Sequence, residues 1–79
     1  MTKKDWGKVV MGNLVHAQLL FFKDGVVVID EVVNILDTAF SIITTYKLRE
    51  RDYFEDVIRR INSELCLAGY PSEVITKFH

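Results

Sequence analysis

The clearest pattern of apolar and polar positions lies between Val28 and Tyr46, where the two kinds of residue separate onto opposite halves of a helical wheel. The apolar half spans roughly 180°, wider than the ~100° stripe through which a surface helix packs on one neighbour. Its members are Val28, Ile29, Val32, Val33, Ile35, Leu36, Ala39, Phe40, Ile42, Ile43 and Tyr46. The pattern predicts a central helix over about residues 28–47 that contacts more than one other helix.

A helix before it is predicted over about residues 5–23, with Asp5 placed to cap its first turn by accepting a backbone N–H. Gly7 and Gly12 each lower the stability of a helix by up to ~1 kcal/mol relative to Ala. We therefore interpret both glycines as positions where a neighbouring backbone approaches closely. The main apolar face of this helix consists of Trp6, Val9, Val10, Leu14, Ala17, Leu20 and Phe21.

A second apolar cluster on the same helix consists of Met11, Val15 and Phe22. These side chains project together, roughly 100° or more from the centre of the main face. Two interpretations are open: the helix lies in the middle of a bundle, or the cluster is a surface for a second copy or for another protein. Met11, Val15 and Phe22 are the candidate interface residues of this chain.

The junction between the first two helices admits two structures. In the first, Gly25 adopts a left-handed conformation and turns one helix into the next. In the second, residues 18–29 form a β-hairpin around the same glycine. The flanking segments LLFF and VVVI do not alternate in polarity, and an isolated two-stranded ribbon is marginal in water. The helix–turn–helix junction is therefore favoured.

A third helix is predicted over about residues 53–68, where the apolar stripe narrows to the roughly 100° typical of packing against one partner. Asp52 and Glu55 have the spacing of a capping box at its start. Its polar face offers three ion pairs at helical spacing, Glu55–Arg59, Asp56–Arg60 and Arg60–Glu64.

Gly69 is expected to end this third helix, and Pro71 prevents its continuation. A short fourth helix is predicted between Ser72 and Phe78. The expected fold is all-α, a single domain over residues 1–79 with three main helices and a short C-terminal one.

The size and composition of the chain predict self-association. A chain of 79 residues buries only ~60–65% of its unfolded surface, yet 49% of these residues are hydrophobic. The single cysteine, Cys66, excludes an internal disulfide. Part of the apolar surface is therefore expected to be covered by a second copy, most simply in a two-fold dimer. The free cysteine and the lack of an export signal or a membrane-spanning stretch favour a cytoplasmic location.

The sequence offers little for catalysis or for binding a metal or cofactor. It has no nucleophile motif, no phosphate-binding glycine loop and no CxxC. His16 falls toward the polar side of the first helix, and Cys66 has no basic neighbour to activate it. Asp30, Asn34 and Asp37 share a helix face, but one helix supplies too few ligands for a hard cation. We expect no enzymatic activity, no cofactor and no metal.

Nucleic-acid binding is the alternative function. The segment Leu65–Thr76 resembles a helix-turn-helix in its turn glycine, the aromatic residue after it and the Ser-initiated segment that follows. Leu65 stands where that motif needs a small side chain, and the net charge of −1 provides no general attraction to phosphate. A DNA- or RNA-binding regulator using residues 61–78 is therefore second choice.

The first choice is a small cytoplasmic helical module that forms homo-oligomers and binds another protein as an adaptor, inhibitor or assembly factor. One version is an accessory protein through which a virus or mobile element blocks a host complex. This assignment follows from the class of protein and not from particular residues.

Overall fold

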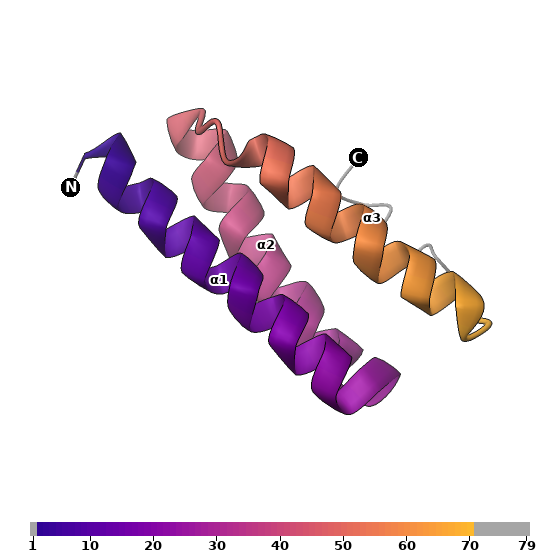
Figure 1. The fold of residues 1–79 in the computed structure, drawn as a ribbon. Helices are drawn as coiled ribbons and strands as arrows, with labels where there is room; N and C mark the ends of the chain where they lie inside the picture. Colours follow the sequence, from indigo (N-terminus) through magenta and orange to yellow (C-terminus); the bar gives the residue numbers. More distant parts are fainter. Residues whose placement is uncertain (1, 71–79) are drawn as a thin grey trace.

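The computed structural model describes residues 2–70, which form four helical elements. In chain order these are α1 (Lys3–Asp24), the 3-10 helix η1 (Gly25–Val28), α2 (Ile29–Tyr46) and α3 (Arg51–Leu67) (Figure 1). The all-α fold class is confirmed. The alternative β-hairpin at residues 18–29 is wrong, because that segment is helical and residues 2–70 contain no strand. The short helix predicted between Ser72 and Phe78 lies outside the described residues.

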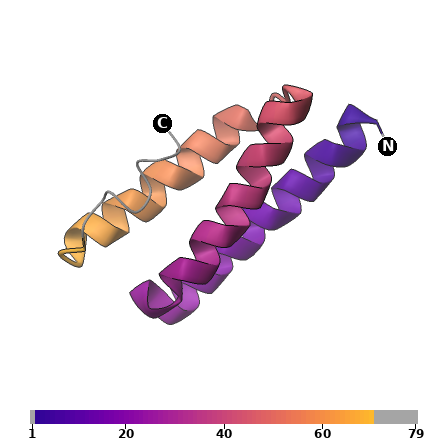
Figure 2. The ribbon, with the colours of Figure 1, turned by 180° about the vertical axis from the view of Figure 1, so that it is seen from behind.

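The helices form a flattened bundle that measures 40 × 23 × 16 Å. Helices α1 and α2 lie side by side and antiparallel, as the two opposite views show (Figures 1 and 2). Helix α3 runs back antiparallel to α2 and diverges from the other two toward its C-terminal end (Figures 1 and 2). The wide apolar half of α2 therefore meets two neighbours, as its pattern predicts.

The core is built from one face of each helix. Its fifteen buried residues are Val10, Leu14, Ala17, Phe21, Ile29, Val32, Leu36, Ala39, Ile43, Leu48, Phe54, Val57, Ile58, Ile61 and Leu65. The Phe40 and Phe54 rings, 5.6 Å apart, join α2 to α3. Trp6 and Leu20 are half-buried against the core, whereas Val9, which the wheel places on the main apolar face, is exposed.

The cap of α1 differs from the prediction. Thr2 is the N-cap, and the backbone N–H of Asp5 donates to its Oγ1 at 3.3 Å. The Asp5 carboxylate accepts from the backbone N–H of Thr2 at 3.1 Å, which completes a capping box. Asp5 as N-cap is therefore wrong: the T-x-x-D spacing places it inside the first turn, where its charge also suits the helix dipole.

The junction between α1 and α2 also differs from the predicted helix–turn–helix junction, because no non-helical turn separates the two helices. The chain is helical without interruption from Lys3 to Tyr46, because η1 joins α1 directly to α2. The two predicted helices are thus the arms of one long, sharply bent helical run. Gly25 makes the bend with φ 75° and ψ −153°, a conformation that only glycine adopts without strain. Since the following residues are helical, one glycine is enough to reverse the chain.

A lysine produces the break between α2 and α3. Lys47 has φ 53° and ψ 53°, the left-handed conformation usually reserved for glycine at the end of a helix. The N–H of Leu48 then donates back to the carbonyl of Ile43 at 3.2 Å, and the Leu48 side chain is buried. The predicted capping box of Asp52 and Glu55 is wrong, because α3 begins at Arg51 and its N-cap residue, Glu50, makes no side-chain cap bond.

The end of α3 confirms the role predicted for Gly69. This residue has φ 76°. Its N–H donates to the carbonyl of Cys66 at 3.0 Å, and the N–H of Tyr70 donates to the carbonyl of Leu65 at 2.9 Å. These two bonds make a Schellman motif, which satisfies carbonyls that the helix leaves without partners.

The ion pairs on α3 join other residues than the spacing predicted. Arg51 pairs with Glu55 at 3.5 Å, and Arg59 reaches back one turn to Asp56. The predicted pairs Glu55–Arg59, Asp56–Arg60 and Arg60–Glu64 do not form. Because α3 begins two residues earlier than predicted, Arg51 lies on the helix and forms an ion pair with Glu55. Arg59 therefore pairs with Asp56 and not with Glu55.

Candidate functional site

Helix α1 carries an exposed apolar stripe in addition to its buried face. The three candidate interface residues are all on it and all exposed, and two further residues extend it to the start of η1. We define the α1 stripe as Met11, Val15, Leu19, Phe22 and Val26. These side chains are between 37% and 67% exposed. Spacings of four, four and three residues keep the first four on one side of α1, and Val26 follows the Gly25 bend at the start of η1.

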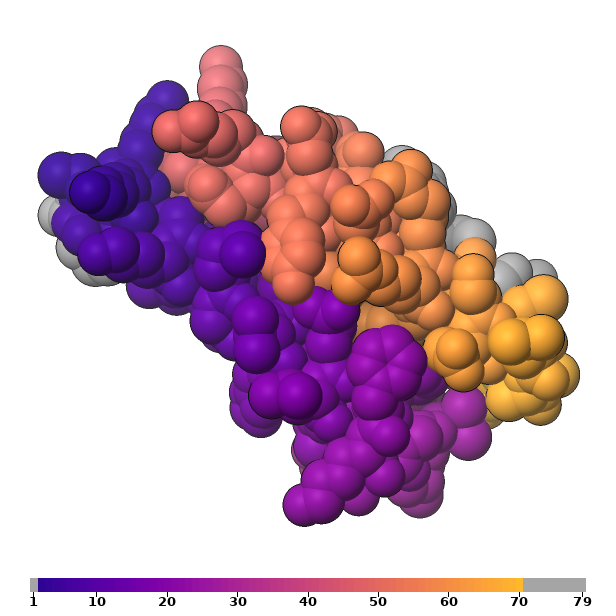
Figure 3. Space-filling model, in the orientation of Figure 1, coloured from indigo at the N-terminus to yellow at the C-terminus, as the bar shows by residue number. Residues whose placement is uncertain are grey.

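The α1 stripe is distinct from the face through which α1 enters the core. Val10, Leu14, Ala17 and Phe21 are at most 4% exposed. Figure 3 shows α1 at the surface along its length, beside α3. The interpretation in which α1 occupies the middle of the bundle therefore does not apply to the described residues. The role of Met11, Val15 and Phe22 at an interface stays a prediction.

Gln18 marks the border between the stripe and the packed part of the molecule. Its Nε2 donates to the Tyr53 hydroxyl of α3 at 2.9 Å. A second, longer bond of 3.4 Å runs from the same nitrogen to the carbonyl of Leu14. The Gln18 amide therefore links α1 to α3. Leu19, the next residue, is already on the exposed side of α1. The helical wheel of α1 alone does not reveal this bond, because its acceptor is 35 residues away in sequence.

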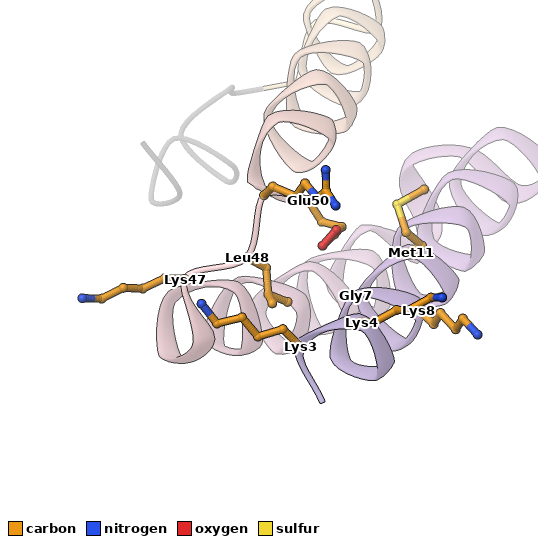
Figure 4. A pocket seen from close by; sticks show the side chains of 9 residues that line it. Lys3, Lys4, Gly7, Lys8, Met11, Lys47, Leu48 and Glu50 are labelled. Atoms are coloured by element: carbon orange, nitrogen blue, oxygen red, sulfur yellow. The ribbon is translucent and has the colours of Figure 1, made fainter. Parts of the chain in front are cut away.

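A basic cleft lies at the N-terminal end of α1, against the loop between α2 and α3 (Figure 4). Its volume is about 840 Å³. We define the basic cleft by its lining residues, Lys3, Lys4, Gly7, Lys8 and Met11 from α1 and Lys47, Leu48, Arg49 and Glu50 from the loop. Sequence reasoning missed this site, because its two halves are more than thirty residues apart and each half is unremarkable alone.

Three contacts bring the loop against the start of α1. Trp6 stacks on Tyr46 with ring centroids 4.8 Å apart and an interplanar angle of 16°. Leu48 is buried in the core just after the left-handed Lys47. Gly7 allows the Glu50 side chain to lie directly on the helix, since a Cβ at this glycine would be only 2.8 Å from Glu50 Oε1. A close approach does occur at Gly7, but the predicted approach of a neighbouring backbone is wrong, because the neighbour is the side chain of Glu50.

Gly12 does not share this role. A Cβ added there would meet no atom within 4 Å. The close approach predicted for this glycine is therefore wrong within the described chain, because Gly12 is on the exposed side of α1 while Gly7 faces the loop.

The cations of the basic cleft form no ion pairs within the described residues, whereas two arginines of α3 do. Both ion pairs among residues 2–70 lie on α3. Lys3, Lys4, Lys8, Lys47 and Arg49 have no carboxylate oxygen within the 4.0 Å limit of an ion pair in this part of the chain. Glu50 is the one carboxylate in the lining, and the positive end of the α1 dipole adds to the local potential.

The basic cleft and the α1 stripe form one continuous surface. Lys8 precedes Met11 by three residues and Lys4 precedes Lys8 by four, which places both lysines on the same side of the helix as the stripe. Met11 belongs to both, since it lines the cleft and begins the stripe. One side of α1 is therefore basic at its N-terminal end and apolar over the rest of its length.

The other residues singled out from the sequence do not converge on a site. His16 and Cys66 are exposed. Asp30, Asn34 and Asp37 remain on the exposed face of α2. Among the described residues, no group of three or more His, Cys, Asp or Glu side chains is arranged to hold a metal ion. No helix in this part of the chain is long and apolar enough to cross a membrane.

Comparisons with known proteins add no relationship. No family model matches this chain, and neither a curated protein nor a solved structure matches it. The case for a function therefore rests on the geometry of the α1 surface.

Proposed function

We propose that this protein is a small helical interaction module that forms homodimers through the α1 stripe. The observation that carries the proposal is the stripe itself, four exposed apolar side chains aligned on a helix whose opposite face is already packed, with Val26 beyond its end in η1. Contiguous apolar surface of this kind on a small chain is typical of an interaction site. Two of its spacings, from Val15 to Phe22, follow the four–three pattern of helices that pack lengthwise on each other.

The area required is compatible with the size of the molecule. A stable interface covers ~800 Å² per partner, which is roughly one sixth of the 5135 Å² accessible surface of this chain. The part of the stripe on α1, from Met11 to Phe22, spans about three turns of helix, and its flanking side chains supply the rim. We expect a dissociation constant in the range of about 1–100 µM, because part of the gain offsets the lost freedom of two small chains.

Within this proposal the dimer acts as an adaptor, inhibitor or assembly factor. Such proteins function by surface complementarity, and the two-fold dimer presents every remaining surface twice. The exposed face of α2 beyond its first turn, which contains Asn34 and Ser41, lies away from the α1 stripe and is presented by both copies.

The proposal is tested by sedimentation equilibrium from about 1 to about 100 µM. The wild-type chain should change from monomer to dimer over this range. Leu19→Asp should remain monomeric, because it places a charge in the middle of the stripe, where burial without a partner is strongly unfavourable. The matched control is Leu67→Asp on α3, since this leucine is 82% exposed and lies off the stripe. It should dimerise like the wild type.

The candidate residues from the sequence are tested in the same assay. The double variant Met11→Asp, Val15→Asp should lose dimerisation by at least about 100-fold while keeping the helical circular dichroism of the wild type. A wild-type chain that is monomeric and cooperatively folded at about 100 µM would refute the proposal.

A further inference from the structure

The charges of the molecule are separated along α1. The end with the N-terminus carries the five cations of the basic cleft, with the carboxylate of Glu50 in the lining and that of Asp5 in the first turn of α1. The opposite end, where the chain reverses through η1, carries three acidic residues, Asp24, Asp30 and Glu31, and one cation, Lys23. Helix α2 contains three carboxylates and no lysine or arginine. The α1 stripe lies between a basic end and an acidic end.

The position of the stripe sets the register of a two-fold antiparallel pair. On α1 the stripe runs from Met11 to Phe22, so its centre falls between His16 and Ala17. A two-fold axis through this centre places Met11 of one copy opposite Phe22 of the other. In the same register Lys8 lies opposite Gly25, where the chain reverses and leads through η1 to Asp30 and Glu31.

We propose that the basic cleft of one copy receives the acidic turn of a second copy, at Asp30 and Glu31, in an antiparallel two-fold dimer. This inference rests on the proposed self-association and adds its geometry and its specificity. The cleft is incomplete in one chain, because its lining contains five cations and a single carboxylate. The second copy supplies the missing carboxylates, and symmetry forms the contact twice.

Electrostatics selects this arrangement over the parallel one. A parallel pair would bring two sets of five cations together at one end and two acidic turns together at the other, and both contacts are repulsive. The antiparallel pair makes both contacts attractive. Glu50 occupies the cleft beside Gly7 in the single chain, and its flexible side chain can move aside for a carboxylate of the second copy.

The experiment uses two charge-reversed variants of the full chain. The basic-end variant is Lys4→Glu, Lys8→Glu, and the acidic-end variant is Asp30→Lys, Glu31→Lys. Each variant alone should weaken the homodimer by about 10- to 100-fold, because each has like charges at both symmetric contacts. Dissociation constants are measured by sedimentation at low salt, where such contacts are strongest.

Mixing the two variants provides the decisive measurement. A heterodimer of the two has opposite charges at both contacts, so it should form within about threefold of the wild-type dissociation constant. Native mass spectrometry with one isotope-labelled variant separates the heterodimer from both homodimers. The quadruple variant should also recover homodimerisation, because reversing both ends restores the attraction within each pair.

Matched controls separate these contacts from a general effect of charge. Arg60→Glu reverses a cation on the exposed side of α3, and Asp52→Lys reverses a carboxylate in the first turn of α3, as Asp30→Lys does in α2. Both controls should dimerise within about threefold of the wild type.

Two results would overturn the inference while leaving the proposed function intact. The first is a wild-type dissociation constant in both charge-reversed variants, which would assign the cleft to another acidic ligand. The second is an absence of preference for the heterodimer in the mixture. A wild-type chain without any dimer would instead refute the proposed function itself.

Discussion

The two apolar faces of α1 are made of similar residues and lie in opposite environments. The inner face, with Leu14 at its centre, is fully buried against α2 and α3. The side chains of the outer face, with Leu19 at its centre, are between 37% and 67% exposed. The same helical period produces both faces, so period alone does not decide burial. The number of neighbours available in a chain of 79 residues decides it, because α2 and α3 cover only one side of α1.

The largest difference between the faces should appear on truncation. Leu14→Ala should lower the free energy of unfolding by about 3 kcal/mol, because it removes buried methyl groups and leaves a cavity. Val15→Ala, one residue along on the outer face, should lower it by less than about 0.5 kcal/mol in the monomer. Urea unfolding is the measurement, in the Leu19→Asp background so that dimerisation does not contribute. Equal losses at the two positions would contradict the assignment of the faces.

The two glycines of α1 provide a finer comparison. Gly12→Ala should stabilise the monomer by about 0.5–1 kcal/mol, because alanine favours the helix and its Cβ meets nothing within 4 Å. Gly7→Ala should give a smaller gain or a loss, since its Cβ would be 2.8 Å from Glu50 Oε1 and must displace that side chain.

Thermal unfolding of both glycine variants, again in the monomeric background, tests this pair. Adding Glu50→Ala to Gly7→Ala should restore a gain like that of Gly12→Ala. A Gly7→Ala variant that is already as stable as Gly12→Ala would show that the Glu50 contact has no energetic consequence.

The last prediction concerns Lys47, which ends α2 and also lines the basic cleft. Lys47→Gly should stabilise the monomer by about 0.5–1 kcal/mol, because the left-handed conformation at φ 53° is unfavourable for a side chain with a Cβ. The same change removes one cation of the basic cleft, so the dimer should weaken by up to about threefold. Chemical unfolding and sedimentation give the two values separately. Lys23→Gly is the control, since it lies within α1 and should destabilise the monomer by about 1 kcal/mol.

Much of the fold could be predicted from local patterns. The all-α class, the wide packing face of α2 and the role of Gly69 follow from periodicity and from the properties of glycine, and the structure confirms them. The helix caps were harder, because several residues near each end can accept a backbone N–H. Thr2 rather than Asp5 caps α1, and no side chain caps α3.

The candidate site could be predicted only in part. Met11, Val15 and Phe22 were recognisable because a helical wheel places them together, and all three are exposed. Leu19 and Val26 extend their stripe. The basic cleft could not be predicted, because Lys8 and Arg49 line the same cleft only after Trp6 stacks on Tyr46 and the chain turns at Lys47.

The sequence by itself determined that this protein is helical, that α2 needs two neighbours and that α1 has two apolar faces, since these properties depend on residue spacing along a helix. The tertiary structure alone decided that α1 and α2 are one bent helical run, that a lysine takes the left-handed position after α2, and that a cleft of unneutralised cations lies at the start of α1. The physical reason is the range of the interactions. Periodicity acts over a few residues, whereas the burial of Leu48 and the contact of Glu50 with Gly7 depend on segments that only packing brings together.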